Sequence, residues 1–467
     1  MGKLNLGIDL ASRTEHVATL ADERGRYLWQ GKRFRTTKDD LEALTEGIDP
    51  SELTVIIEPT TNAWVPVAAH FLAAEVHVVL VPPEQSADLR RYYSKHAKND
   101  RLDSRLLARL PLLHPEGLRP LSDLGPGQPL KRAVRRRANL VEDRTATHNR
   151  IAALLELLGP AYLEALGDGD FPKAALALLG RYGDPRALRR LGKARLATLL
   201  RRSTRGRWGE RKAEQLLAAA HEAIFLWEGG GLDFTELAWD LASETRVAQA
   251  IDAELSEVER RIERLYAEAD PGGIMASAPG VGPALAPGIL GRLGDARRFA
   301  NLAAVRSFSG YVPATEQSGT TEGNPGITKA GDPGLRRDLF LAADQARRVD
   351  PQLAARYHRL MVDRGLHHTS AICHLATALL TRIAACWRKQ ERYSLRDVDG
   401  RAITEAEGRA IVAERYRIPE EVREARRKTR KAQRHKNRTG RRSEESTEAA
   451  PTSDPSPGER TPEAVLA

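Results

Sequence analysis

The feature that most constrains the fold is an alternation of short apolar strands and helices over residues 1–110. Apolar residues recur at every second position in "KLNLGIDLA", and "HVATLADERGRYLWQGKRF" predicts two more strands joined by a turn. Further strands are predicted at "LTVIIEPT" and "VHVVLVPP", with helical patterns between and after them. The order β-β-β-α-β-α-β-α predicts an α/β domain with a mixed sheet.

The rest of the chain is predicted to be mostly helical. Residues 111–130 are rich in Pro and Gly and read as a linker. Residues 131–270 contain two long helices with apolar spacings of three and four, typical of a coiled coil formed with each other or with a second subunit. A basic helical insertion at 159–240 separates them.

The C-terminal part is predicted to be a helical domain over 271–392, followed by a tail at 393–467. In the domain, "APGVGPALAPGILGRLGDARRF" resembles a helix-hairpin-helix, whose amides can hold a DNA phosphate; a glycine turn between packed helices explains it equally well. The tail is basic and then acidic, and we expect it to be largely disordered. The fold class is therefore α/β plus all-α.

Charge and cysteine content limit the partners and the compartment. The formal net charge is +10, which favours a polyanionic partner, although a basic tail alone could account for it. Cys373 and Cys386 are too few for a disulfide scaffold and lack zinc-site spacing, so we expect buried thiols in a reducing cytoplasm. We expect no signal peptide and no transmembrane helix.

Four acidic residues form the candidate catalytic set. Asp9 lies in the first strand, Glu58 ends another, and Asp100 and Asp103 share one face where a helix begins. If these strands are neighbours, the carboxylates converge and require cations between them, such as two Mg²⁺ ions, with Mn²⁺ able to replace them. Acidic residues are common at such positions, and Asp100 could merely favour the helix dipole.

These residues carry a resemblance to a known family. "GIDLAS", "IIEPT" and "KNDRLDSRLLARL" resemble the RuvC-like, RNase H-fold domain of DEDD-type insertion-sequence transposases, the group that includes Piv-type DNA invertases. "APGVGPALA", "RFANLAAVRSFSGYVPATEQSG" and "ITKAGDPGLRRDLFLAA" resemble the C-terminal transposase domain of the same group. The resemblance implies a DNA transposase that cuts and rejoins strands by Mg²⁺-dependent phosphoryl transfer.

The resemblance also implies a nucleophile and partners. Ser318 in "EQSGTTEG" matches the family's nucleophilic serine, which attacks a DNA phosphate; Ser309 is a competing candidate that reads better as a packing position. The family implies a composite site between subunits, a dimer of dimers at synapsis and a structured non-coding bridge RNA. Six basic residues are candidates for binding nucleic acid: Lys329, Arg336 and Arg337 near the serine, and Arg135, Arg136 and Arg137 on the first long helix.

Two other functions are compatible with the sequence. A RuvC-like metal-dependent nuclease or junction resolvase would use water in place of Ser318. A non-catalytic nucleic-acid-binding protein would have lost part of its site, which the complete D, E, D, D set argues against.

Overall fold

The computed structural model describes residues 4–59, 61–81, 83, 85–86, 88, 100–115, 118–121, 124, 128–167, 169–312, 316–318, 321–323 and 327–427. Two compact units divide the chain. The first comprises Met1–Pro271 and Leu290–Gly294, and the second Gly272–Ile289 and Asp295–Ala467.

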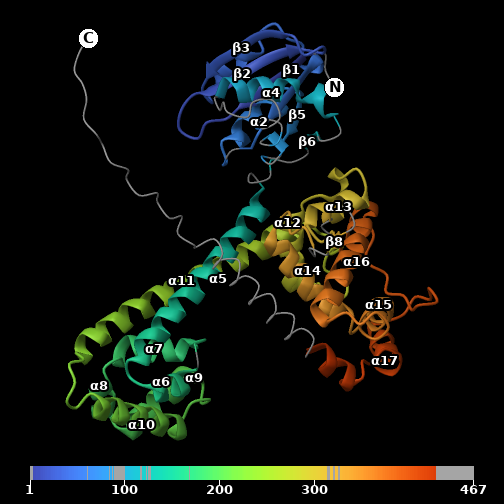
Figure 1. The fold of residues 1–467 in the computed structure, drawn as a ribbon. Coiled ribbons are helices and arrows are strands. Elements are labelled where there is room, and N and C mark those ends of the chain that lie inside the picture. The colour runs from blue at the N-terminus through green and yellow to red at the C-terminus, as the bar shows by residue number, and fades with distance from the viewer. Residues whose placement is uncertain are drawn as a thin grey trace, which may run out of the picture. The chain divides into compact units, whose positions relative to one another are not determined.

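The first unit begins with a six-stranded mixed sheet in the order β3-β2-β1-β4-β5-β6 (Figure 1). β1, β4 and β5 run parallel to one another, while β2, β3 and β6 run antiparallel to their neighbours. The strands are β1 (Leu4–Asp9), β2 (His16–Asp22), β3 (Tyr27–Phe34), β4 (Leu53–Ile57), β5 (His77–Leu80) and β6 (Arg119–Pro120). The predicted mixed sheet is thus observed, with one short edge strand added from the stretch read as a linker.

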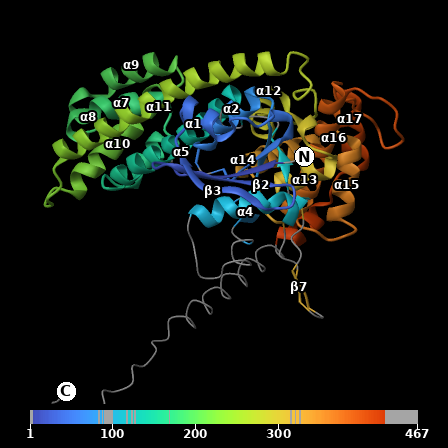
Figure 2. The same ribbon diagram turned by 90° about the horizontal axis from the view of Figure 1, so that it is seen from above.

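Helices cover both faces of this sheet (Figure 2). The residues of β1 and β4 that share a face with Leu6 and Val55 pack against α1 (Lys38–Leu44) and α2 (Trp64–Ala73). Thr37 caps α1, because its side chain accepts a hydrogen bond from the Asp40 amide. The opposite face packs against α4 (Asp100–Leu113), which contacts β1, β2 and β3.

Two long helices of the first unit, α5 (Pro129–Glu156) and α11 (Phe234–Ala269), lie side by side (Figure 1). Arg137 pairs with Glu259 at 2.8 Å, while Arg150, further along α5, pairs with Glu244 at 2.9 Å. From the first ion pair to the second, residue numbers increase along α5 and decrease along α11, so the two helices are antiparallel. Val247, which the apolar spacing would place in the contact, is 45% exposed, and its neighbour Ala248 is buried.

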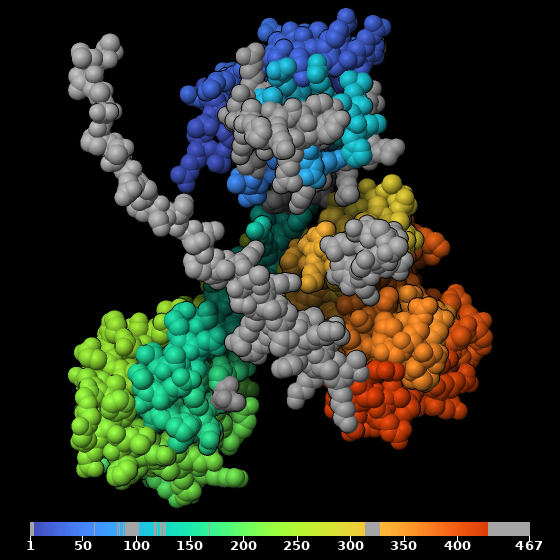
Figure 3. All heavy atoms as spheres, in the orientation of Figure 1, coloured from blue at the N-terminus to red at the C-terminus, as the bar shows by residue number. Residues whose placement is uncertain are grey.

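Five shorter helices connect the long pair and share one apolar core with its distal ends. In the space-filling view their atoms, in teal and green, form one closely packed body (Figure 3). Tyr162 and Phe171 are the largest buried side chains of this core, which Ile151 of α5 and Leu241 of α11 also join. The helices are α6 (Pro160–Leu166), α7 (Lys173–Tyr182), α8 (Pro185–Leu191), α9 (Lys193–Thr204) and α10 (Glu210–Leu226).

In its described residues the second unit is mostly helical and contains one small hairpin. Its elements are α12 (Gly282–Leu293), which ends in the first unit, η4 (Ala296–Arg298), α13 (Leu302–Ser309), β7 (Glu316–Ser318), β8 (Thr321–Gly323), α14 (Pro333–Ala346), α15 (Pro351–Met361), α16 (His368–Lys389) and α17 (Glu405–Arg415). By length and composition α16 could cross a membrane, with a mean hydropathy of 1.3. It packs against α13, α14 and α15 as the central helix of this unit, and its buried face explains its apolar composition.

Residues 271–281 allowed two structures on sequence grounds. Of the two alternatives for this stretch, the glycine turn fits better than the helix-hairpin-helix, because residues 271–281 form mostly turns before α12. A Cβ on Gly280 would come within 2.2 Å of the Ala342 carbonyl oxygen, so this turn is built for close packing against α14.

Part of the predicted tail packs on the second unit. Tyr393 donates a hydrogen bond to buried Asp350 at 2.6 Å, and α17 begins with a capping box at Thr404. The rest of the predicted tail, 428–467, lies outside the described residues.

Candidate active site

Asp9 and Glu58 stand at the ends of two neighbouring parallel strands. Ile8 of β1 is paired in register with Ile57 of β4, so Asp9 and Glu58 occupy the next register position. Parallel neighbours lie about 4.8 Å apart, and partners in register point to the same face. The sequence condition for convergence, that these strands be neighbours, is therefore met for this pair.

Helix α4 packs unusually close to the face that carries these two acids. Gly7, two residues before Asp9, shares its face, and a Cβ at this position would come within 2.3 Å of the Ala108 nitrogen. Thr19 of β2 is the strand partner of Gly7 in β1. The Thr19 hydroxyl forms a 2.9 Å hydrogen bond with the hydroxyl of buried Ser104 on α4. The absence of a side chain at Gly7 thus lets the backbone of α4 touch the sheet.

The direction of α4 brings its acidic first turn toward Asp9. Its later residue Arg109 donates to the carbonyl oxygen of Gly25 at 2.9 Å, and Gly25 lies in the turn beyond the opposite end of β1. The helix therefore runs antiparallel to β1. Asp103, 6% exposed, lies in the part of α4 nearest the carboxyl ends of β1 and β4.

These placements bring three predicted acids to one edge of the sheet without completing a metal site. Among the described residues, no three His, Cys, Asp or Glu side chains are arranged to hold one ion. Asp100 begins α4, but its side chain lies outside the described part of the chain. Carboxylate oxygens are nevertheless the donors that Mg²⁺ prefers, so the residue types fit the metal.

His16 is a structural neighbour of this edge that the sequence pattern did not single out. Its Nδ1 accepts a hydrogen bond from the Ala11 amide at 3.2 Å, and its Nε2 bonds to the Thr36 hydroxyl at 2.8 Å. Burial lowers the pKa of the imidazole, which suits the neutral form with one donor and one acceptor nitrogen. His16 thus fixes the loop that follows Asp9.

The predicted nucleophile lies on the small hairpin of the second unit. Ser318 is the last residue of β7 and is paired with Thr321 of β8; its side chain lies outside the described atoms. At the base of this segment, the Thr328 amide donates to Val312 and the Lys329 amide donates to Gly310. The chain crosses tightly there, because a Cβ on Gly310 would come within 1.9 Å of the Ala330 carbonyl oxygen.

The basic residues predicted near the serine have unequal roles. Arg336 directs its Nη1 to the carbonyl oxygens of Gly331 at 3.0 Å and Ala330 at 3.3 Å, so it holds the base of the hairpin segment. Arg337 is half-exposed and contacts Asp338 at 3.4 Å. Lys329 is exposed with a left-handed backbone at φ 54°. Of the three, Lys329 and Arg337 are therefore the more accessible to a phosphate.

The competing serine is part of the packing. Ser309 is fully buried, donates a hydrogen bond to the Arg306 carbonyl at 2.7 Å and accepts one from the Tyr311 amide. These contacts fit the packing role that the sequence favours.

The predicted basic residues on the first long helix are exposed along α5. Arg135 and Arg136 face solvent, while Arg137 is occupied by its ion pair with Glu259 on α11.

Comparisons with known proteins place both regions in one group. A DEDD-type family model named for IS110 and described as "Transposase" matches residues 6–160, and one described as "Transposase IS116/IS110/IS902 family" matches 273–358. The first region contains the four acids and the second contains Ser318.

Relatives agree with the family models. The uncharacterized 43.6 kDa protein of insertion element IS110 from Streptomyces coelicolor is 31% identical over 262 residues, or 55% of this chain and 62% of that relative. The uncharacterized 44.8 kDa protein of IS116 from Streptomyces clavuligerus is 28% identical over 381 residues, covering 79% of this chain and 91% of the relative. The uncharacterized 42 kDa protein of IS900 from Mycobacterium paratuberculosis is 27% identical, covering 83% and 96%.

Proposed function

We propose that this chain is an insertion-element transposase of the IS110/IS116 family, which its two matching regions resemble, and that it cuts and rejoins DNA at the ends of a mobile element. The observation that carries the proposal is the placement of Asp9, Glu58 and Asp103 at one edge of the sheet, beside a helix in backbone contact with β1. A RuvC-like fold is consistent with the strand order and with the DEDD character of the matching family.

The DEDD family suggests dependence on a divalent metal. We assign its binding to Asp9, Glu58, Asp100 and Asp103, with Mg²⁺ in a two-ion arrangement and Mn²⁺ able to replace it. When bound, such ions neutralise phosphate charge and lower the pKa of an attacking hydroxyl. The acids of this chain would position that charge at the sheet edge, and His16 would keep the loop after Asp9 in place.

Ser318 is proposed as the nucleophile. Its oxygen would attack the scissile phosphorus, forming a phosphoserine bond while the bond to one sugar oxygen breaks. The serine loses its proton and the departing sugar oxygen gains one, so the step balances. Support comes from the pairing of Ser318 with Thr321 in the small hairpin and from the close chain crossing at Gly310 near the base of the segment.

The remaining expectations extend this proposal. We propose a cytoplasmic protein that acts as a dimer and as a tetramer at synapsis, with a structured non-coding RNA guiding the choice of DNA. The net charge of +10 and the exposed Arg135 and Arg136 support a nucleic-acid partner.

The proposal is tested by strand cleavage and by a covalent adduct. In Mg²⁺, the full chain should cleave DNA that carries the element ends and become linked to it. Asp9→Asn should lower cleavage at least about a hundredfold, since it removes one charge from the site. The exposed Asp39→Asn, on α1, is the matched control and should cleave normally.

The serine is tested separately. Ser318→Ala should abolish both the adduct and cleavage, while Ser307→Ala, an exposed serine on α13, should change neither. Cleavage that survives Ser318→Ala but not Asp9→Asn would identify a RuvC-like nuclease instead. Full activity in both variants would remove the proposed site altogether.

A further inference from the structure

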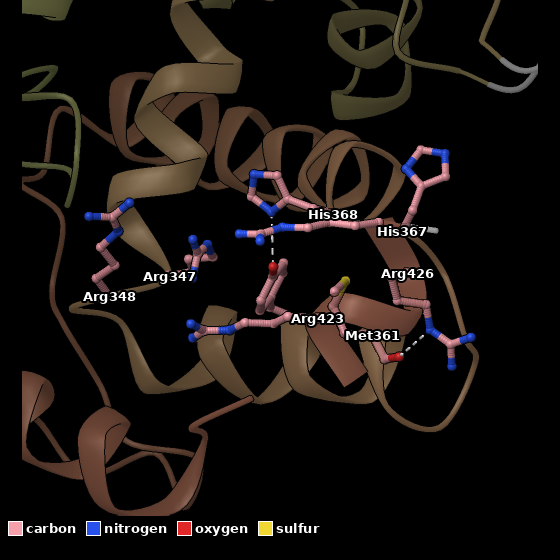
Figure 4. Close-up of a pocket in the computed structure, with 9 residues that line it drawn as sticks. Arg347, Arg348, Met361, His367, His368, Arg423 and Arg426 are labelled. Carbon is pink, nitrogen blue, oxygen red and sulfur yellow. Dashed lines mark hydrogen bonds between the residues drawn. The ribbon is translucent and has the colours of Figure 1, made fainter. Parts of the chain in front are cut away.

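A basic pocket of about 530 Å³ lies within the second unit, and none of the residues assigned above lines it (Figure 4). Five arginines contribute to its lining, with two histidines, a tyrosine and a methionine. The lining residues are Arg347, Arg348, Tyr357, Met361, His367, His368, Arg423, Arg426 and Arg427.

The arginines reach the pocket from two separate elements. Arg347 and Arg348 come from the end of α14, and the other three from the helix over residues 420–427, which belongs to the segment that the sequence assigned to a tail. Figure 4 shows Arg347 and Arg348 on one side of the pocket and Arg426 on the other. Two parts of the chain some 75 residues apart therefore concentrate positive charge in one cavity.

Carboxylates balance only part of this charge. Asp344 contacts Arg347 at 2.7 Å and Arg348 at 3.1 Å, and Glu420 contacts Arg423 at 3.4 Å. Five guanidinium groups against these two carboxylates leave an excess of positive charge, which favours an anionic ligand.

The amino terminus of α16 adds to the attraction for an anion. His367 caps this 22-residue helix, and its Nδ1 accepts a hydrogen bond from the Ser370 amide at 3.3 Å. His368, the first helical residue, is held by a 2.9 Å hydrogen bond between its Nδ1 and the Tyr357 hydroxyl. Both histidines line the pocket, so the positive end of the helix dipole adjoins the arginines.

Some of the arginines are fixed in place before any ligand arrives. Arg347 lies 4.4 Å from the centre of the Tyr357 ring and is mostly buried. The Arg426 guanidinium lies against Gly365, where a Cβ would come within 3.1 Å of it, and its Nε donates to the Met361 carbonyl at 3.4 Å. Arg348 and Arg423 are more exposed, at 55% and 48%, and are free to turn toward a ligand without disturbing the core.

We propose that this pocket binds the phosphodiester backbone of a single nucleic-acid strand. Guanidinium groups pair with phosphate through two parallel hydrogen bonds, and a cavity of this volume accepts a small number of nucleotides but not a duplex. The inference rests on the proposed function only in taking nucleic acid as the partner. DNA and RNA share this backbone chemistry, so the experiment includes both.

The test measures how binding depends on salt. The full chain and the double variant Arg348→Gln/Arg423→Gln are titrated with a 30-nucleotide single-stranded DNA, the RNA of the same sequence and the corresponding duplex. Losing two phosphate contacts to a single strand should reduce the slope of log K against log salt by about 1.4, and weaken binding roughly tenfold near 0.15 M salt. Duplex binding should be unchanged. If the variant loses more affinity for the RNA, the pocket binds RNA; if it loses more affinity for the single-stranded DNA, the pocket binds DNA.

Two control variants separate charge in the pocket from charge and folding in general. Arg401→Gln/Arg409→Gln removes two arginines from the same unit that are similarly exposed and likewise paired with carboxylates, and it should keep the parent slope. Arg348→Lys/Arg423→Lys preserves the charge and should restore most of the slope. Melting temperatures near that of the parent would show that all variants fold.

Three outcomes would overturn the inference. They are an unchanged slope in the pocket variant, an equal loss in the Arg401/Arg409 control, and tighter binding by the pocket variant. Tighter binding would point to an acidic peptide as occupant, such as the Glu- and Asp-containing residues 444–463 of this chain. Since binding is measured without cleavage, failure here leaves the tests with Asp9 and Ser318 intact, and inactivity there leaves the salt slope interpretable.

Discussion

At the scale of single residues, Gly7 lets helix α4 approach the strand that carries Asp9. The missing side chain permits backbone contact between α4 and β1, and the hydrogen bond between Thr19 and Ser104 depends on that contact. Asp103 lies one residue before Ser104, so the distance of α4 from the sheet sets the distance of Asp103 from the strand that carries Asp9.

Gly7→Ala should therefore damage stability and activity together. The added Cβ would overlap backbone atoms of Ala108 and Ser104, which cannot move without shifting α4, and we expect a loss of about 1–3 kcal/mol in unfolding free energy. Strand cleavage should fall further than the folded fraction does. Gly229→Ala is the control, since nothing lies within 4 Å of its added Cβ. Parent-like melting and cleavage in Gly7→Ala would contradict the close packing.

His148 gives the helical part of the first unit a pH-dependent stability. Burial, helped by the charge of Arg144, holds the pKa of this imidazole below its usual value of 6.5, and Nδ1 accepts a hydrogen bond from the Phe171 amide at 3.3 Å. The unfolded chain therefore takes up a proton that the folded chain resists. Stability from this group is complete above pH 6.5 and is lost as the pH falls below it.

Urea unfolding at pH 7.5, 6.5 and 5.5 measures this effect. The stability of the parent should fall below pH 6.5, and His148→Gln, which keeps an acceptor for the Phe171 amide, should reduce that dependence by at most about 1.4 kcal/mol per pH unit. The other buried histidines are present in both proteins and cancel in the comparison. Identical pH dependence in the two proteins would rule out His148 as a source.

Individual residues also mark how far the sequence could predict the site. The sequence predicted that Asp9 and Glu58 converge only if their strands are neighbours, and the parallel pairing of β1 with β4 meets that condition. The contact of Arg336 with the base of the hairpin segment could not be predicted, since it depends on carbonyl groups that a tight chain crossing brings together. The pocket arginines were missed because they come from two elements whose contact no local pattern encodes.

At the scale of elements, the antiparallel pairing of α5 and α11 decides the architecture of the middle of the chain. Its apolar spacing predicted two long helices but left open whether they pair within one chain. The ion pairs Arg137–Glu259 and Arg150–Glu244 show intramolecular pairing and its direction. The apolar spacing was misleading at Val247, which is 45% exposed, while the adjacent Ala248 is buried.

Charge reversal tests that pairing. Arg150→Glu or Glu244→Arg alone places like charges together at a partly exposed site and should cost about 1 kcal/mol, while the double reversal should recover most of this loss. Urea unfolding of the four proteins gives the coupling energy directly. If the double variant loses as much unfolding free energy as the two single variants lose together, the two side chains do not meet in solution.

At the scale of the whole molecule, the acids and the serine belong to different compact units. The family resemblance implies that one subunit supplies the acids and another the serine, a feature that no single-chain sequence pattern can reveal. The succession of strands and helices along residues 1–110 could be predicted because it follows from local apolar patterns. The proposed composite site could not be predicted from such patterns, because it would combine residues of separate subunits.

Mixing inactive variants tests this division. Asp9→Asn and Ser318→Ala proteins are each expected to be inactive. In an equal mixture, half of the randomly formed dimers contain one subunit of each variant. In such a dimer, one of the two composite sites combines intact acids with an intact serine. Cleavage should therefore return to about a quarter of the parent level. If the acids and serine of one chain act together, the mixture stays inactive.

The antiparallel course of α5 and α11 has a consequence for how this protein can change in size. The chain leaves α5 and re-enters α11 at the same end of the pair, and everything between, α6 to α10, is attached there. The start of α5 and the end of α11 keep their positions if equal numbers of turns are added to or deleted from both helices. The same holds if a foreign domain with adjacent termini is grafted in at the connected end. Gene-length variation and reporter insertion are thus structurally tolerable at this one position of the chain.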